Sequence, residues 1–132
     1  MALLGDDILG LGTDLVEIAR LAKAVERTGQ AFLEKVYAPA ELEAAPAKEP
    51  RRTEYLAGRW AAKEALAKAL GTGITEKCRL NEICVLNDPD GRPVMTLSGS
   101  ARETAGALGV RRILLSISHE RTYATATVLL TR

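Results

Sequence analysis

The chain has 132 residues and nearly balanced charge, with 18 lysines and arginines against 17 aspartates and glutamates. This length favours a single domain over 1–132, and the charge balance gives no support for general nucleic-acid binding. No apolar run reaches the roughly 20 residues of a membrane-spanning helix. Residues 1–7 carry two aspartates and no basic segment. We therefore expect no signal peptide, no membrane partner and a cytoplasmic protein.

The first half of the sequence is typical of one short strand followed by helices. Residues 8–12 are apolar and contain two glycines, which predicts a buried strand that another backbone approaches closely. A helix is then expected to begin at Thr13 and Asp14 and to stop at Thr28-Gly29, because its apolar residues follow helical spacing. Three further helical segments are expected around 32–37, at 39–43 and at 52–70, with a surface loop at 44–50.

The second half changes to strand periodicity. The tetrapeptide Asp88-Pro89-Asp90-Gly91 is a strong turn signal between two expected strands, at 83–87 and 93–97. A helix over 98–108 and a second hairpin of strands 112–118 and 122–130 complete the chain. The order is roughly β-α-α-β-β-α-β-β. It predicts an α+β fold with a largely antiparallel sheet packed against one long helix.

Several common site types are excluded or stay open. Cys78 and Cys84, with one histidine in the chain, are too few for a structural zinc site. The two thiols are either a disulfide or two small apolar residues around a strand. Gly10-Leu11-Gly12 lacks the third glycine of a dinucleotide fingerprint, and Asp14 follows where a pyrophosphate would need open backbone amides. No nucleophile elbow accompanies His119, so we do not expect a hydrolase triad.

Asp14 and Glu64 are the candidate metal ligands. Mg²⁺ takes one or two protein carboxylates and completes its coordination with water and substrate phosphates. Each carboxylate also has an ordinary explanation, which the spacing leaves open. Asp14 and Glu17 fit a helix capping box. Glu64 and Lys68 lie one helical turn apart and fit an ion pair worth about 0.2–0.5 kcal/mol.

The cations of the long helix are candidate phosphate ligands. Arg59 and Lys63 are four residues apart, so both side chains share one helix face, and Lys68 follows one turn later. Gly71-Thr72-Gly73 either ends the helix or lets a ligand approach the backbone. His119 ends an expected strand, where it is either a phosphate contact or a hydrogen-bonded imidazole.

Four segments of the chain match one known family in the family's order. Together they resemble the holo-[acyl-carrier-protein] synthases, the small group of 4′-phosphopantetheinyl transferases. Lys63-Glu64-Ala65 with its Gly71-Thr72-Gly73 end, coupled to the early Gly12-Thr13-Asp14, is highly specific. The resemblance covers nearly the whole chain and is carried by residues 10–20, 59–73, 90–93 and 116–119.

The resemblance implies transfer of phosphopantetheine from coenzyme A to a serine of apo-acyl carrier protein, releasing adenosine 3′,5′-bisphosphate, in support of fatty acid biosynthesis. It makes Asp14 and Glu64 the catalytic Mg²⁺ ligands and Lys63 a catalytic pyrophosphate contact. The base that deprotonates the serine stays open between a carboxylate at the metal and a metal-bound water. The coenzyme A contacts implied are Arg59, Lys63, Lys68, Gly71 and His119.

The resemblance also implies partners. Acyl carrier proteins are acidic, so Arg20 and Arg27 on the helix after Asp14 would pair with them. Family members of this length form homotrimers with the active site between protomers. Trp60 stands where the family usually has phenylalanine, a change expected to affect packing alone.

Overall fold

The structure is a computed structural model and describes residues 7–132, so the expectation about residues 1–6 lies outside the described part. No helix among the described residues is long and apolar enough for a transmembrane segment. Apart from a short 3₁₀ turn at Leu80–Glu82, the elements are β1 (Ile8–Glu17), α1 (Ile18–Val36), α2 (Pro39–Ala44), α3 (Arg51–Leu70), β2 (Ile83–Asn87), β3 (Pro93–Leu97), α4 (Gly99–Ala107), β4 (Arg112–His119) and β5 (Tyr123–Thr131).

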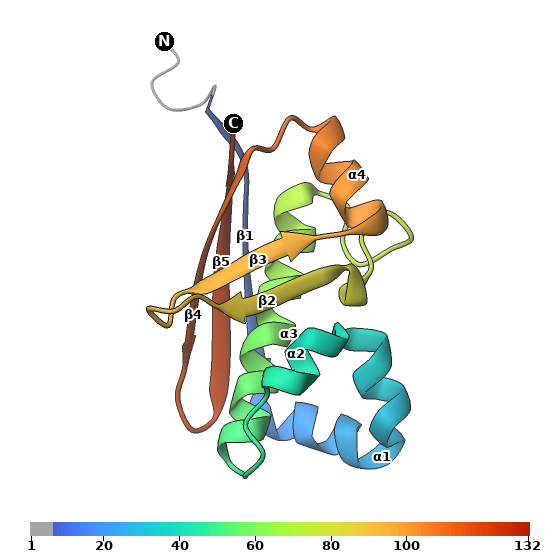
Figure 1. Ribbon diagram of the computed structural model, residues 1–132, viewed down its shortest axis with the longest axis vertical. Helices are drawn as coiled ribbons and strands as arrows, with labels where there is room; N and C mark the ends of the chain where they lie inside the picture. The colour runs from blue at the N-terminus through green and yellow to red at the C-terminus, as the bar shows by residue number, and fades with distance from the viewer. Residues whose placement is uncertain (1–6) are drawn as a thin grey trace.

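Two antiparallel sheets surround one long helix. Strands pair in the order β1-β5-β4, and β2 pairs with β3 in a separate hairpin. Figure 1 shows α3 running along one face of the three-stranded sheet, with α1 and α2 gathered at one end of the molecule and α4 at the other. The alanines of α3 are buried against the sheet and the hairpin, because small side chains let all three layers approach closely. The predicted α+β fold and both predicted hairpins are confirmed.

The first strand is longer than predicted, and this moves Asp14. β1 continues to Glu17, so Asp14 lies inside a strand opposite Ala126 of β5 and begins no helix. The predicted helix start and the Asp14–Glu17 capping box are therefore wrong. The reason is tertiary: residues 13–17 find backbone partners along β5, and this pairing overrides local helical spacing.

The helices differ from the prediction in two places. The predicted stop at Thr28-Gly29 is a kink inside α1: Gly29 has φ +56°, and the helix resumes as far as Val36. Within the described residues, three helices precede β2. The predicted order β-α-α-β-β-α-β-β has two there, and of the four predicted helical segments the first two join in α1. The other predicted helices agree within a residue or two, including α3 and α4.

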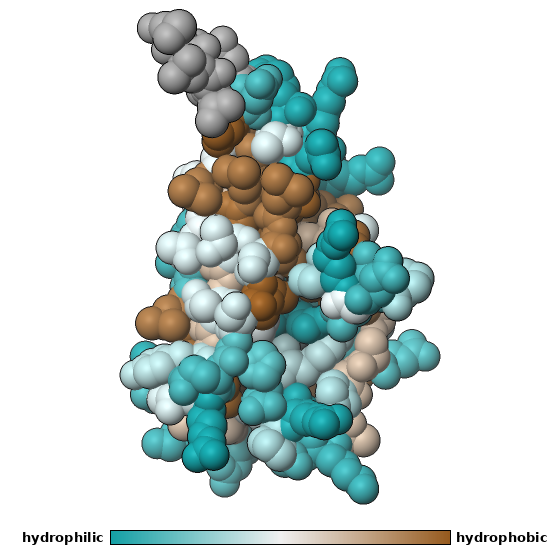
Figure 2. Space-filling model, turned by 90° about the vertical axis from the view of Figure 1, so that its left-hand side faces the viewer, coloured by the Kyte–Doolittle hydropathy of each residue, from teal (hydrophilic) through white to brown (hydrophobic). Residues whose placement is uncertain are grey.

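The outer face of the three-stranded sheet is apolar and uncovered in the single chain. Leu11 and Leu15 of β1 are 66% and 64% exposed, and Leu114 of β4 is 45% exposed. Register places Leu11 and Leu114 on either side of Leu129. Figure 2 looks onto this face and shows the apolar side chains gathered in one patch in its upper half. A contiguous apolar patch of this kind is typical of an interaction surface.

The two cysteines form no disulfide with each other. Cys78 is fully buried in the core and Cys84 is half-buried on β2, both as free thiols. Burial raises the pKa of Cys78 to about 11. The sequence left open a disulfide or two small apolar packing residues, and in the structure both cysteines serve as packing residues.

The partly buried carboxylate of Glu82 should make the stability of the fold sensitive to acid. Glu82 accepts hydrogen bonds from the backbone amides of Ser100, Ala101 and Arg79, at 2.9, 3.2 and 3.0 Å, and so caps α4. Partial burial opposes its ionisation, but the Ser100 side chain and these amides lower the pKa of Glu82 from 4.5 to about 2. Its stabilisation is therefore complete above pH 4.5 and is lost as the pH falls toward 2.

Glu82→Gln is expected to lower the free energy of unfolding at pH 7 by about 1–2 kcal/mol, the usual cost of losing a charged helix cap. At pH 2 the difference from the unmodified chain should largely vanish, because Glu82 is then becoming protonated as well. Urea denaturation at both pH values measures this. An equal deficit at both would contradict the role of the charge.

Candidate metal and phosphate site

Glycines bring the strand that carries Asp14 against the helix that carries Glu64. Gly10, Gly12 and Asp14 alternate along β1, so all three face α3. A Cβ atom at Gly10 would lie 2.1 Å from the carbonyl oxygen of Ala69, and one at Gly12 would lie 2.0 Å from that of Ala65. Two strand residues therefore advance as far as four helix residues, about 6 Å. Two residues further along β1 and four residues back along α3, Asp14 lies beside the helical turn 61–64, which ends at Glu64.

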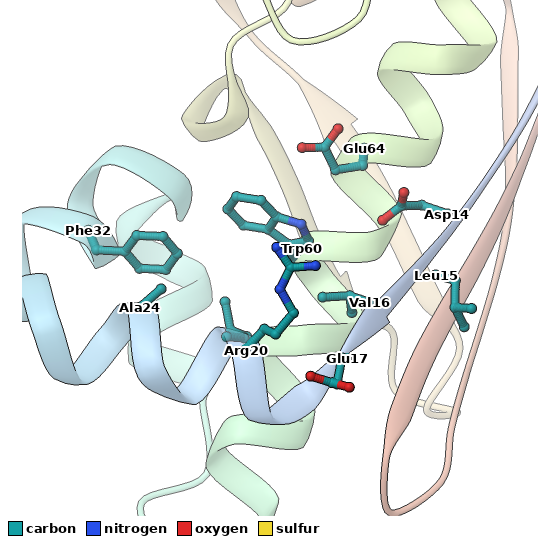
Figure 3. A pocket seen from close by; sticks show the side chains of 10 residues that line it. Asp14, Leu15, Val16, Glu17, Arg20, Ala24, Phe32, Trp60 and Glu64 are labelled. Carbon is teal, nitrogen blue, oxygen red and sulfur yellow. The ribbon is translucent and has the colours of Figure 1, made fainter.

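Asp14 and Glu64 line one cavity of about 360 Å³. Figure 3 shows the two carboxylates at one end, with Asp14 projecting from β1 and Glu64 from α3. The opposite wall is apolar and contains Trp60 and Phe32, whose rings stack with centroids 5.7 Å apart. The cavity thus joins an acidic corner to an aromatic wall. Its remaining lining residues are Leu15, Val16, Glu17, Arg20, Leu21 and Ala24.

The acidic corner has unbalanced negative charge. Burial raises the pKa of Glu64, the charge of Asp14 raises it further, and Lys68 partly opposes this. Lys68 donates to Asp14 Oδ1 and to the carbonyl oxygen of Thr13, both at 3.0 Å. Among the described residues, the predicted Glu64–Lys68 ion pair is replaced by Lys68–Asp14. The lysine is 53% exposed, so it can leave without burying an unpaired charge.

The donor set fits Mg²⁺. Residues 7–132 contain no cluster of three or more carboxylate, histidine or cysteine side chains, so a multidentate protein cage is absent from this part of the chain. Two carboxylates beside an open cavity are what Mg²⁺ uses when substrate phosphates and water supply the rest. The raised pKa of Glu64 is consistent with this, because a cation would relieve the repulsion from Asp14.

Arg59 and His119 line a second hollow, of about 290 Å³. Arg59 is held there: its Nη2 donates to Asn87 Oδ1 at 3.0 Å, and its guanidinium stacks 4.0 Å above the ring of Tyr55. Arg51 adds a further cation. His119 lies on β4 and Asp14 on β1, with β5 between them, so the two hollows open at opposite edges of the sheet. Within one chain, Asp14 lies with Glu64 and Arg59 lies with His119, but these two parts of the predicted site are separated.

Lys63 lies in neither hollow. Its side chain is fully buried, and its Nζ donates to Glu41 Oε1 at 2.6 Å, to the Leu80 carbonyl at 3.0 Å and to the Ile83 carbonyl. Burial lowers the pKa of Lys63, while the charge of Glu41 opposes that shift. This position argues against the predicted catalytic and pyrophosphate contact, because the amine faces away from the acidic corner and all its donors are used.

The other predicted contacts lie on exposed surfaces. Arg20 lines the cavity beside the carboxylates, whereas Arg27, two turns further along α1, does not. Gly71 is the C-cap of α3, with φ +83°, so the predicted helix stop is confirmed. It lies seven residues beyond Glu64, about 10 Å along the helix direction. Its contact with coenzyme A stays a prediction, as do those of Lys68 and His119.

The sequence did not reveal Glu41, nor that Trp60 and Phe32 form a wall of the cavity. Glu41 is fully buried and serves as the counter-ion of Lys63. Its one available signal was an acidic residue in the first turn of a proline-initiated helix, which usually indicates capping. Trp60 was expected to affect packing alone, but it lines the same cavity as Glu64.

Comparison with known proteins supports the resemblance. The family model of the 4′-phosphopantetheinyl transferase superfamily matches residues 10–128. The chain is 48% identical over 123 residues to a holo-[acyl-carrier-protein] synthase of Vibrio campbellii, covering 92% of this chain and 96% of that protein. The crystal structure of the Neisseria meningitidis synthase superposes with a TM-score of 0.87 at 34% identity, covering 95% and 99%. The Bacillus anthracis synthase, solved in complex with CoA (3′,5′-ADP), gives 0.80 at 36% identity, covering 95% and 97%.

Proposed function

Because the chain belongs to the 4′-phosphopantetheinyl transferase superfamily, we propose that it converts apo-acyl carrier protein to the holo form. The carrier's serine oxygen attacks the β-phosphorus of coenzyme A. A new phosphate ester forms, and the bond to the α-phosphate breaks to release adenosine 3′,5′-bisphosphate. The observation that carries this is the convergence of Asp14 and Glu64 on one open cavity. The product would serve fatty acid biosynthesis, and a cytoplasmic location stays a prediction.

We propose that Asp14 and Glu64 hold Mg²⁺ between them. When bound, the ion would stabilise the negative charge that develops on the transferring phosphoryl group. Lys68 leaves Asp14 for a substrate phosphate, which its exposure permits. Arg59 supplies a fixed, charged donor because Asn87 and the Tyr55 ring already orient its guanidinium. Arg20, beside the acidic corner, pairs with the acidic carrier as it docks, and Arg27 extends this basic face.

We further propose that the active enzyme is a homotrimer in which the two hollows meet. Asp14 and Glu64 line one edge of the sheet, while Arg59 and His119 line the other. One coenzyme A can contact both groups when one copy's β1 edge lies beside the next copy's β4 edge. The uncovered leucines of the outer sheet face supply apolar area for this assembly.

Leu114→Glu is expected to convert the trimer to monomers and to reduce activity by at least about 100-fold, because a buried unpaired carboxylate opposes association and separates the half-sites. Light scattering coupled to size-exclusion chromatography gives the mass. The matched control is Val94→Glu, since Val94 is similarly exposed, at 44%, but lies on β3 outside this face. An active monomer would contradict the shared site.

The transfer reaction itself is tested by mass spectrometry of an apo-carrier incubated with the protein, coenzyme A and Mg²⁺. The expected product is heavier by one phosphopantetheine unit and appears only with all three present. Binding of coenzyme A without this mass gain would favour a non-catalytic binding module. Repeating the assay with several apo-carriers, including those of peptide synthases, then measures the substrate range.

A further inference from the structure

A fully buried ion pair links three elements next to the site. Lys63 of α3 and Glu41 of α2 are both 0% exposed, with 2.6 Å between Nζ and Oε1. Glu41 also accepts from the backbone amides of Val85 in β2 and of Ala38 at the start of α2, each at 2.9 Å. Within the described part of the chain, no buried side-chain polar atom lacks a partner. The pair is therefore satisfied on both sides and joins α2, α3 and β2 at one point.

The same ion pair fastens the wall of the cavity. α1 ends at Val36 and leads through Tyr37 directly into α2, so α1 and α2 form one continuous arm. Tyr37 is buried, and its hydroxyl donates to the Leu56 carbonyl of α3 at 2.6 Å. Glu41 makes the second attachment of this arm, through Lys63. The arm carries Phe32, which stacks on Trp60 of α3 and forms the aromatic wall of the cavity with it.

The cost of burying two charges shows that the pair is not a simple stabiliser. Removing a lysine and a carboxylate from water is unfavourable, and a buried pair often adds no net stability over an apolar one. The pair instead fixes the relative positions of α2, α3 and β2, because Lys63 needs acceptors and Glu41 needs donors at defined places. The carbonyls of Leu80 and Ile83 and the amide of Val85 meet that need in this one arrangement. Lys63 and Glu64 are neighbours on α3, so this anchor also fixes the turn that carries Glu64.

We propose that Glu41 and Lys63 are positioning residues: they hold the α1–α2 arm against α3 and so set the width of the cavity beside Asp14 and Glu64. The kinetic consequence rests on the proposed function, since the arm carries the basic carrier-binding residues. When the anchor is weakened, the carrier-side wall moves most, because Phe32 lies on the arm itself. The hollow of Arg59 and His119 moves less, since α3 and β4 carry those two residues, although the Tyr55 hydroxyl that donates to the Glu41 carbonyl at 2.8 Å links it to the same anchor.

Trp60 is the chain's one tryptophan, so its fluorescence reports the wall directly. In Glu41→Gln, which removes the charge but keeps the shape, the emission should shift to longer wavelength as Phe32 withdraws and water enters. The KM for the apo-carrier should rise about tenfold or more, and by a larger factor than the KM for coenzyme A. The matched control is Glu103→Gln, which removes one carboxylate charge at an exposed position of α4 and should leave both the emission and the carrier KM unchanged.

Tyr37→Phe provides a milder version, because it removes only the hydroxyl bond to Leu56 and leaves the ion pair buried. It should give a smaller shift of the Trp60 emission in the same direction, and it answers the question if Glu41→Gln fails to fold. A lowered melting temperature with unchanged emission and carrier KM in the folded variants would overturn the proposal. Since the emission is measured without substrates, a shifted emission in a chain without transferase activity would overturn the proposed function alone.

Discussion

Glu64→Gln is expected to abolish phosphopantetheine transfer while raising the thermal stability of the metal-free chain. Burial and the nearby charge of Asp14 raise the pKa of Glu64, so its ionised form is less favourable in the folded chain than in the unfolded one. The stabilisation from a protonated Glu64 is present below its unfolded pKa and is lost as the pH rises through its folded pKa. A glutamine keeps the neutral form at pH 7. Its amide oxygen carries no negative charge, so it is a much weaker Mg²⁺ ligand than a carboxylate.

Activity and melting temperature, measured on the same samples, test this expectation. The transfer rate should fall by about 10²–10³-fold or more, the usual loss when charge stabilisation at the reacting group is removed. Mg²⁺ at 100 times its Kd should stabilise the unmodified chain by about 2.7 kcal/mol and leave Glu64→Gln unchanged. Glu103→Gln, an exposed position on α4, is the control. A variant that melts earlier and still responds to Mg²⁺ would show that Glu64 is a structural residue.

Long, periodic elements could be predicted from the sequence, and the start of α1 could not. The alanine-rich α3 and the Asp-Pro-Asp-Gly hairpin satisfy their local preferences, so propensity and structure agree. Asp14 is different, because residues 13–17 are equally compatible with a capped helix start. Their pairing with β5, more than a hundred residues away, decides the outcome. Local spacing contains no information about that partner.

The charges of α3 show the same limit at the site. Spacing placed Arg59 and Lys63 on one helix face, and both do point toward β2, where they donate to the carbonyls of Val85 and Ile83. Helical periodicity cannot tell whether a charged face lies inside or outside. Lys63 is inside because Glu41, 22 residues earlier, supplies its counter-ion. Carboxylate chemistry made Asp14 and Glu64 candidate metal ligands, but their ordinary explanations stayed open until the family resemblance favoured the metal site, since no local pattern connects residues 50 positions apart.

Gly12→Ala is expected to damage stability and metal binding together, because Gly12 sets the separation between β1 and α3. The added Cβ would lie 2.0 Å from the Ala65 carbonyl oxygen and 2.7 Å from the Ala69 amide nitrogen. Both atoms belong to helix backbone, which cannot rotate away as a side chain can. The strand must therefore move outward, and Asp14, two residues further along the same face, moves with it. Overpacking of this kind costs about 1–3 kcal/mol.

Mg²⁺ affinity separates this displacement from a general loss of stability. For Gly12→Ala, isothermal calorimetry in the folded range should give an affinity about tenfold or more below that of the unmodified chain, because metal ligands tolerate little misplacement. Gly106→Ala on α4 is the matched control: its added Cβ meets nothing within 4 Å. That change should stabilise the chain by about 0.4–1 kcal/mol and leave metal affinity unchanged. A destabilised Gly12→Ala chain with normal Mg²⁺ affinity would mean that the glycines serve packing alone and that another contact positions Asp14.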